Sequence, residues 1–446
     1  PLEIVAVAPI ELGLTLRPYQ WGGGLLGLAL ALLVITKKLS WPLFRWHPID
    51  TILTLLVGGI VLSGVIHQGL ALKQSIILVS FLGLYFLSRL FLRTGQDIGQ
   101  ALRFFFLSGS LVLGWALVQN ILFLTGHESF SVMPGRPNGT LSEPDWLGLF
   151  ILFLLAPTLF WLKTRLVEGF DIKKIWLPWG MMTLLLLVLI LTVSRSAWLG
   201  GVVLTSLFIL TAFFEFGKPF MVRGALLLIQ CLSVSLVLAL VCIETVPLTR
   251  FALIDRAAST ASHDQTITLA CDGSVLPPAH IGAIEELAQY GCQHILLEET
   301  ELYREQGKLV TTTKRPDPNV GIRKKIYELS LTEIQAHPLL GIGWGNIGPK
   351  LGVDERGASY NASNLFLELW LGGGLMALGA FLAFLGWVFW VSYRAWKTAF
   401  LPEFFAPIGA LTGGFLVFNL FNTGLLLGFV WVWFALFPVV FPRMNR

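Results

Sequence analysis

Three arginines lie in sequence contexts that suit anion binding, and Arg195 is the most informative of them. It lies in the triplet Ser194-Arg195-Ser196, which interrupts the apolar run Trp176–Phe216. An arginine at membrane depth costs several kcal/mol unless its side chain reaches the headgroups or binds an anion. Because a guanidinium group is always charged and grips phosphate oxygens with paired hydrogen bonds, we expect an anion at Arg195. A side chain that snorkels to the headgroups is the alternative.

Arg323 lies in a second basic segment. Apolar residues at near-helical spacing predict a helix over Val320–Ala336, and the His-Pro pair that follows ends it. The first turn of this predicted helix carries Arg323, Lys324 and Lys325, although the helix dipole disfavours cations there. A phosphate on the helix N-terminus would offset this cost. A solvated basic patch that meets anionic headgroups is the alternative.

Arg136 is the only Arg or Lys in the loop GHESFSVMPGRPNGTLSEPDWLG, residues 126–148. It suits a contact with either a lipid headgroup or a substrate. Glu143 and Asp145 of the same loop form a possible acid pair. Carboxylates near a helix N-terminus also serve as dipole partners, and both interpretations stay open.

Polar residues gather near residue 365, where a predicted span enters the membrane. Ser363 and Asn364 lie at this point, and Glu368 lies one helical turn beyond Asn364 on the same face. A carboxylate partly withdrawn from water suits a general base, so Glu368, supported by Asn364, is a candidate catalytic residue. A packing carboxylate bound to a backbone donor is the alternative.

The glycine-rich stretch HPLLGIGWGNIG begins at His337. Gly341, Gly343 and Gly345 allow close backbone approach or left-handed turns. The stretch does not follow a strand of a βαβ unit, so it predicts no dinucleotide fold. No Walker-type motif and no paired His/Cys spacing is present, so we expect no nucleotide and no metal cofactor. His337 fits a residue at a helix end better than a catalyst.

The elements that must position these residues are mainly membrane spans. Of the 446 residues 55% are apolar and 13% are charged, whereas about a quarter are charged in soluble domains. Eleven apolar runs read as helices, at about 20–36, 50–66, 73–92, 104–125, 145–163, 176–194, 197–215, 223–246, 365–393, 404–422 and 425–442. The predicted fold class is an all-α polytopic membrane protein with about 11–12 transmembrane helices. Composition excludes collagen, coiled coils and disordered tails.

Basic loops give the orientation. Every second connection is basic, through Lys37, Lys38, Arg45, Arg89, Arg93, Arg103, Lys163, Arg165, Lys173, Lys174, Lys218, Arg223, Arg394, Lys397, Arg443 and Arg446. The positive-inside rule assigns these connections to the cytoplasm. Only the single cations Arg17, Lys73, Arg136 and Arg195 then fall in short connections on the other side. The first span would run from outside to inside, so we expect a helix upstream of Pro1.

Three parts of the chain follow from this pattern. Residues 1–246 form a bundle of eight spans, 247–362 form one long extracytoplasmic segment of ordinary soluble composition, and 363–446 form a bundle of three spans. The run Trp176–Phe216 must fold back near Ser194–Ser196, because one helix of that length would extend about 61 Å across a core of roughly 30 Å.

Two of the four cysteines lie in the outer segment. Cys271 and Cys292 can pair if this segment faces an oxidising compartment, but spacing alone does not decide it. Cys231 and Cys242 fall in apolar runs and fit packing residues.

The order of these pieces resembles the O-antigen ligase and polymerase superfamily of bacterial membrane glycosyltransferases. The matching stretches are GRPNGTLSEPDWLG at 135–148, TVSRSAWLG at 192–200, RKKIY…HPLLGIGWGN at 323–346 and ASNLFLELWLGGGLMALG at 362–379. The resemblance covers the chain from about residue 50 to 442. Each motif is loose, whereas their order, spacing and common outer face are specific.

The resemblance implies a glycosyltransferase of the bacterial plasma (inner) membrane that acts in polysaccharide or lipopolysaccharide biosynthesis. Its donor would be a polyprenyl-diphosphate-linked glycan, and its acceptor a glycan, a lipid or a protein at the outer leaflet. Arg195 and Arg323 match the two arginines thought to hold the diphosphate, with Arg136 as a weaker third. Membrane lipids surround such a protein, and no nucleic-acid partner is expected.

The chain departs from the family pattern at three positions. Ser363 stands where the ligases carry a histidine proposed as base, Ala377 replaces the final glycine, and the usual R-x-x-x-L pattern ends at Tyr327. The missing histidine weakens the case for a lipopolysaccharide-core ligase and fits polymerases and related proteins better. A catalytically dead copy, a non-catalytic scaffold, and a transporter or flippase are the alternatives. We find no inverted repeat of the kind that transporters often show.

Overall fold

The computed structural model describes residues 10–11, 15–16, 18–38, 45–133, 135–169, 171–215, 221–246, 248–249, 253, 264–273, 277–295, 299–353, 359–397 and 405–441. Within these residues the chain is mainly helical, with one small three-stranded sheet and a two-residue hairpin, β1 (Ile10–Glu11) and β2 (Thr15–Leu16). Arg17, Lys218, Arg443 and Arg446, used above for orientation, lie outside the described residues, as does Pro1 with the helix expected before it.

Seven helices in the described part are long and apolar enough to cross a membrane. They are α2 (Pro48–His67), α3 (Gly69–Phe91), α4 (Gly95–Leu124), α5 (Pro144–Val167), α6 (Ile172–Leu191), α8 (Met221–Thr245) and α13 (Leu365–Lys397). The other four predicted spans fall on α1 (Pro18–Ile35), α7 (Arg195–Glu215), α14 (Phe405–Asn419) and the pair α15 (Gly428–Phe434) and α16 (Phe437–Val440). The predicted all-α polytopic fold is confirmed.

Helix ends differ from the predicted spans where capping residues extend a helix beyond its apolar run. The span expected from residue 104 begins at Gly95, because Thr94 and Asp97 form a capping box there. The Asp97 backbone N–H donates to Thr94 Oγ1 at 3.2 Å, and the Thr94 N–H donates to Asp97 Oδ2 at 2.8 Å. These exchanged bonds satisfy amides that the first turn leaves free.

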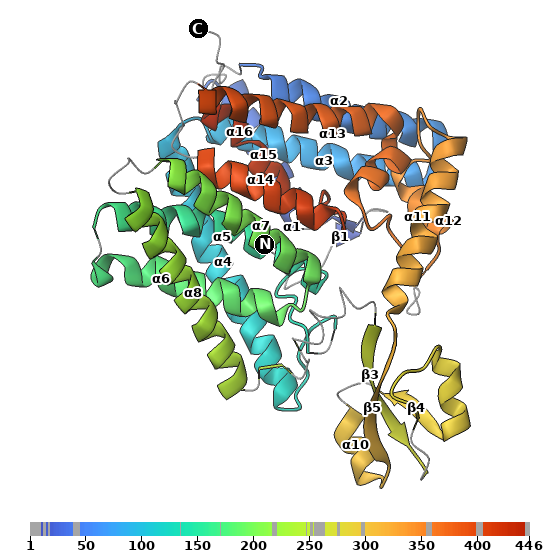
Figure 1. Cartoon of the computed structure of the whole chain (residues 1–446). Coiled ribbons are helices and arrows are strands. Elements are labelled where there is room, and N and C mark those ends of the chain that lie inside the picture. Colours follow the sequence, from blue (N-terminus) through green and yellow to red (C-terminus); the bar gives the residue numbers. More distant parts are fainter. Residues whose placement is uncertain are drawn as a thin grey trace.

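Close helix packing holds the bundle together. α13 packs along α2, and α14 packs along α7, where Gly200 and Gly414 meet. A Cβ on Gly200 would lie 2.9 Å from the Gly414 carbonyl oxygen, so only glycine permits this approach. Figure 1 shows α2, α3 and α13 side by side, with α5 to α8 in a second group.

The segment between α8 and α13 contains a small sheet that the sequence analysis did not predict. Its antiparallel order is β4 (Cys292–Ile295), β3 (Asp264–Cys271) and β5 (Leu309–Pro316). Cys271 and Cys292 are paired across β3 and β4 and form a disulfide. The short helices η1 (Ile284–Tyr290) and α10 (Thr300–Glu305) lie beside the sheet.

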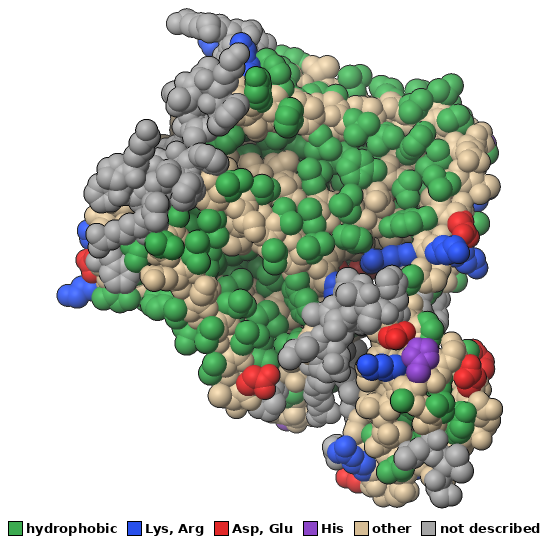
Figure 2. Space-filling view, in the orientation of Figure 1, with side chains coloured by type: hydrophobic (Ala, Val, Ile, Leu, Met, Phe, Trp, Pro, Cys, Tyr) green, Lys and Arg blue, Asp and Glu red, His purple; other side chains and the backbone are tan. Residues whose placement is uncertain are grey.

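The longer helix α11 (Pro318–Ala336) joins this sheet to the helical bundle (Figure 1), and η3 (Trp344–Asn346) and α12 (Ile347–Leu351) follow it. Figure 2 shows hydrophobic side chains over most of the visible bundle surface, whereas charged side chains gather over the sheet and at the bundle edge above it.

Candidate functional site

The turn between α6 and α7 divides the long apolar run and carries Arg195 at the first position of α7. Val193 in this turn has φ +52°, a left-handed conformation that is rare and costly for a β-branched residue. Trp198 Nε1 donates to the Leu189 carbonyl at 2.8 Å and holds the turn from one side. Strain of this kind persists only where the surroundings fix the backbone.

Arg195 forms an ion pair with Asp317, the residue immediately before α11. Arg195 Nη2 lies 3.2 Å from Asp317 Oδ2, and the Asp317 side chain is only 1% exposed. α11 begins at Pro318, two residues before the predicted start, so the predicted first turn was wrong. Arg323, Lys324 and Lys325 lie beyond the first turn, and the helix start carries an acid, the charge that the dipole favours.

Arg136 binds the same α6–α7 turn. Its Nε donates to the Thr192 carbonyl at 2.9 Å, which satisfies a carbonyl at the end of α6. Its Nη2 lies 3.6 Å from Asp145 Oδ1. Asp145 therefore faces Arg136, while Glu143 is exposed at the start of α5. The structure brings Arg136 and Arg195 to one turn.

Gln119 of α4 anchors the loop that carries Arg136, a role that the sequence analysis missed. Its Oε1 accepts from the backbone N–H groups of Asn138 at 3.2 Å and Gly139 at 2.8 Å. Its Nε2 donates to the carbonyl groups of Gly139 at 3.2 Å and Phe130 at 3.1 Å. A glutamine inside an apolar run is itself a signal, because a buried amide needs hydrogen-bond partners.

Arg323 contacts an aromatic ring rather than an anion. Its Cζ lies 5.6 Å from the centroid of the Phe421 ring, which follows α14. Within the described residues Arg323 makes no hydrogen bond or ion pair, in contrast to Arg195 and Arg136. Its guanidinium N–H groups therefore remain available for a ligand.

Ser363, Asn364 and Glu368 together build the start of α13. Ser363 has φ +49°, and its N–H donates to Asn361 Oδ1 at 2.8 Å. Asn364 Oδ1 accepts from the backbone N–H of Phe366 at 2.9 Å, which caps the helix. Glu368 is 4% exposed and its Oε2 accepts from the Ala362 N–H at 2.6 Å. This backbone contact is the one expected of a packing carboxylate.

The turn between α14 and α15 brings these separate pieces together. The Leu420 carbonyl accepts from Asn364 Nδ2 at 3.2 Å. Phe421 lies against Arg323, as described above. Asn422 Nδ2 donates to Ser196 Oγ at 2.6 Å, next to Arg195 in the chain. No sequence signal indicated this meeting of segments, because it depends on the tertiary fold.

The glycine-rich stretch after α11 passes tightly against the bundle. Gly341 and Gly343 have φ values of +67° and +83°, and a Cβ on Gly345 would lie 2.1 Å from the Leu70 carbonyl oxygen of α3. The Ile342 N–H donates to the Leu371 carbonyl at 2.7 Å, close to the kink of α13. These glycines therefore allow the chain that follows α11 to pack against α3 and α13. His337 is exposed at the end of α11.

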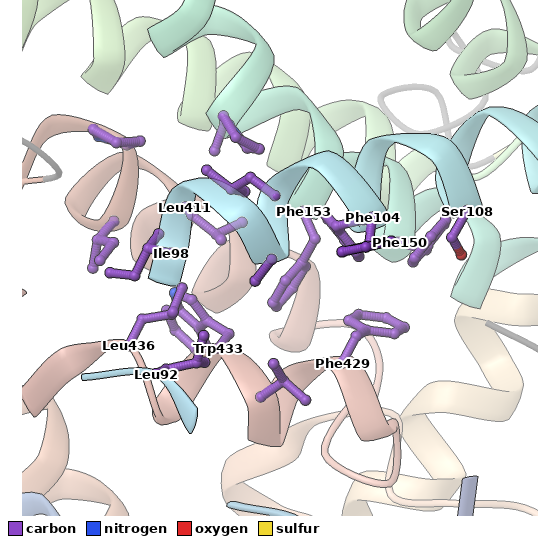
Figure 3. A pocket seen from close by; sticks show the side chains of 18 of the residues that line it. Leu92, Ile98, Phe104, Ser108, Phe150, Phe153, Leu411, Phe429, Trp433 and Leu436 are labelled. Carbon is purple, nitrogen blue, oxygen red and sulfur yellow. The ribbon is translucent and has the colours of Figure 1, made fainter. Parts of the chain in front are cut away.

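An apolar cavity of about 480 Å³ lies between α4, α5, α14 and α15. Phe150, Phe153, Phe429 and Trp433 surround it in Figure 3. Leu141, five residues after Arg136, also lines it. Within the part of the chain that the structure describes, no group of three or more His, Cys, Asp or Glu side chains could hold a metal ion.

Comparison with known proteins finds a family match for the central part of the chain. Residues 179–382 match the family model of the O-antigen ligase, and this stretch includes Arg195, Arg323, Ser363 and Glu368. No curated protein and no solved structure matches the chain. The match supports the chain's resemblance to the O-antigen ligase superfamily of membrane glycan-assembly enzymes.

Proposed function

We propose that this protein transfers a glycan from a polyprenyl-diphosphate donor to an acceptor hydroxyl of a glycan, lipid or protein. The observation that carries the proposal is that Arg195, Arg136 and Arg323 lie at connected turns at the ends of α6, α7 and α14. Three cations beside one another favour a multiply charged anion as ligand.

The chemistry that this arrangement supports is displacement at the anomeric carbon. The acceptor oxygen forms a bond to that carbon, the bond to the diphosphate oxygen breaks, and the hydroxyl proton passes to a base. Negative charge develops on the leaving diphosphate, and Arg195 and Arg323 neutralise it, with Arg136 beside them. Arginine suits this role because its planar fork grips two phosphate oxygens at once. The reaction proposed here uses no metal ion.

Glu368 and Asn364 remain the groups proposed to activate or orient the acceptor hydroxyl, with Ser363 beside them. Asp145 lies in an ion pair with Arg136 and Asp317 in one with Arg195, so both carboxylates already neutralise cations. Glu368 Oε2 instead accepts a hydrogen bond of 2.6 Å from the Ala362 N–H, and Glu368 lies one turn from Asn364. The location of Glu368 beside the turn at Ser363 supports a role in activating or orienting the acceptor hydroxyl.

The apolar cavity supports a donor with a long lipid chain. Its lining along α4 runs from Ile98 to Ser108, about 15 Å at 1.5 Å per residue. Leu141 connects this lining to the loop of Arg136. A diphosphate held at the arginines would therefore have apolar space available to its chain within the bundle.

The proposed site lies on the extracytoplasmic face of the bacterial plasma membrane, in the segment 247–362 and the adjacent ends of the bundles 1–246 and 363–446. The alternation of basic loops supports this orientation. The Cys271–Cys292 disulfide supports it independently, because disulfides persist in oxidising compartments.

Transfer by the full-length protein in proteoliposomes tests the proposal. The probe is a polyprenyl-diphosphate-linked oligosaccharide with a labelled sugar, and the membrane extract of cells lacking the protein supplies the acceptor. We expect Arg195→Ala and Arg323→Lys to lower transfer by about 10²–10³, the effect of losing one charge-stabilising donor. Arg304→Lys, on the remote helix α10, is the matched control and should transfer normally.

Glycan analysis of cells with and without the protein identifies the acceptor class. Shorter chains in its absence indicate a polymerase, and unattached full-length chains indicate a ligase. Transfer that is unchanged in both arginine variants would contradict the proposal. Movement of the labelled donor across the bilayer without transfer would favour a flippase instead.

A further inference from the structure

The turn between α14 and α15 is held rigidly at its base. Asn419, the last residue of α14, is fully buried, and its Nδ2 donates to the Phe415 carbonyl at 2.8 Å. Its Oδ1 accepts from the Gly424 N–H at 2.6 Å, which closes the turn. A Cβ on Gly424 would lie 2.5 Å from Leu149 Cδ2 of α5, so the turn also packs closely on that helix. The three residues of the turn that follow Asn419, Leu420 to Asn422, are therefore held in place by these contacts.

Each of these three residues holds a different segment of the proposed site. The Leu420 carbonyl binds Asn364 at the start of α13, and the Phe421 ring lies against Arg323 of α11. Asn422 binds Ser196, which is buried, and Ser196 Oγ also lies 3.3 Å from Ser194 Oγ. Ser194 and Ser196 lie on either side of Arg195 in the chain, so the hydrogen bond from Asn422 fixes the backbone at Arg195.

The two arginines are held by different kinds of contact. Asn422 binds the serine next to Arg195, whose guanidinium pairs with Asp317, whereas Phe421 contacts the Arg323 guanidinium directly. A cation over an aromatic ring is attracted by the ring quadrupole, and the donor N–H groups stay available to phosphate oxygens. The ring can therefore orient Arg323 without competing with an anionic ligand, as a carboxylate would.

We propose that the turn Leu420–Asn422 is the positioning element of the diphosphate site, where Phe421 orients the Arg323 guanidinium and Asn422 fixes the backbone of Arg195 relative to it. This inference rests on the proposed function. The turn lies outside the matched stretch 179–382, so the family match does not assign it. A clamp that spans both phosphates needs its two arginines at a fixed separation, whereas binding of one phosphate does not.

Equilibrium binding to the purified full-length protein tests the role of Phe421. The probes are farnesyl diphosphate and farnesyl monophosphate, measured by calorimetry in one detergent. We expect Phe421→Leu to weaken diphosphate binding about three- to tenfold, the size of a partly exposed cation–π contact. Monophosphate binding should change less, and Phe421→Tyr, which keeps the ring, should restore diphosphate affinity. Phe389→Leu, at a ring that is 75% exposed on α13, is the control and should match the wild type.

A double-mutant cycle tests the role of Asn422. Asn422→Ala and Ser196→Ala should each weaken diphosphate binding, and the double variant should be no weaker than the worse single variant. Additive losses would show that the two side chains do not act through their hydrogen bond and would overturn this half of the inference.

The outcomes separate this inference from the proposed function. If wild-type protein binds farnesyl diphosphate and Arg323→Ala does not, while Phe421→Leu binds normally, the positioning role is overturned and the proposed function stands. An equal loss for diphosphate and monophosphate in Phe421→Leu would also overturn it, since a general packing defect acts on both. If the wild type binds neither probe, the proposed function falls and this inference falls with it.

Discussion

Arg195 Nη2 and Asp317 Oδ2 lie 3.2 Å apart, and this ion pair joins two segments separated by 122 residues. Arg195 begins the apolar helix α7, and Asp317 links β5 to α11. The sequence predicted an anion at Arg195, and the anion beside it is a carboxylate of the chain itself. A diphosphate at Arg195 must therefore share the guanidinium with Asp317 or displace it.

Replacing Asp317 with asparagine separates the stabilising role of this carboxylate from its effect on the ligand. We expect Asp317→Asn to lower the melting temperature, because Arg195 is only 22% exposed and would lose the negative charge of Asp317 beside it. The same change should tighten binding of farnesyl diphosphate severalfold, because a negative charge near the ligand is removed. Calorimetry and thermal unfolding in one detergent measure both effects.

Asp145→Asn serves as the comparison, since Asp145 is 29% exposed and lies 3.6 Å from Arg136. Its effect on the melting temperature should be smaller, because exposed pairs contribute little. Weaker diphosphate binding in Asp317→Asn would contradict the expectation and would show that Asp317 orients Arg195 for the ligand.

The orientation of the chain is testable with single cysteines. In a background with Cys231→Ala and Cys242→Ala, which leaves the Cys271–Cys292 disulfide intact, Gln306→Cys lies in the exposed turn after α10. Glu168→Cys lies in the exposed turn between α5 and α6. A membrane-impermeant maleimide added to intact cells should label position 306 and should label 168 only after permeabilisation. The reverse pattern would remove the proposed site from the outer leaflet.

The N-terminal end of α2 and the C-terminal end of α3 are joined by a buried ion pair whose loss should destabilise the fold. Asp50 is fully buried, forms an ion pair with Arg89 and accepts a hydrogen bond from Tyr85. Its Oδ2 also accepts from the His47 N–H at 2.6 Å. We expect Asp50→Ala to cost about 3–5 kcal/mol, because it leaves the Arg89 charge buried without its partner.

The exposed pair Arg165–Glu168, with Nη1 and Oε2 2.8 Å apart, is the matched control. Both side chains are at least 40% exposed, so Arg165→Ala should cost less than about 1 kcal/mol. Thermal unfolding in the same detergent compares the two variants. Equal losses would contradict the importance assigned to burial.

The seven long apolar helices could be predicted because apolar length alone indicates them, and the α6–α7 turn followed because one helix could not hold the run Trp176–Phe216. The predicted start of α11 was two residues too late. The prediction used the spacing of apolar residues, which does not include the preference of proline, here Pro318, for the first helical position. The sheet was missed, although Leu309–Pro316 is rich in β-branched residues, because a short strand carries little signal without its partners.

The candidate site was only partly accessible to sequence reasoning. Charged residues such as Arg195 and Arg323 stood out because an apolar background makes a charge conspicuous. Phe421 and Asn422 did not, because neither type is unusual at the end of a membrane helix and their partners lie more than 90 residues away. Gln119 could have been found, since a buried amide must be satisfied.

Glu368 and Ser363 allow a decisive test of how the acceptor hydroxyl is activated. A glutamine at position 368 retains an oxygen that can accept from the Ala362 N–H, so the turn at Ser363 should survive Glu368→Gln. If Glu368 is the base, transfer at matched membrane abundance should fall by about 10²–10⁴, because an amide cannot take the proton. Unchanged transfer would leave Glu368 a purely structural acceptor, and Glu368→Ala would then still fail through loss of the turn.

Ser363→His supplies the complementary measurement. The left-handed backbone at position 363, with φ +49°, is one that histidine adopts more readily than most non-glycine residues, so the substitution should fold. An imidazole there would stand beside Asn364, whose amide is fixed by the Leu420 carbonyl and by the helix cap. We expect the double variant Glu368→Gln/Ser363→His to regain transfer relative to Glu368→Gln alone, because a histidine with a pKa near neutrality can accept the proton that the glutamine cannot. Transfer that stays at the Glu368→Gln level would show that the position of Ser363 does not face the acceptor hydroxyl, and the base would have to be sought at the arginine cluster instead.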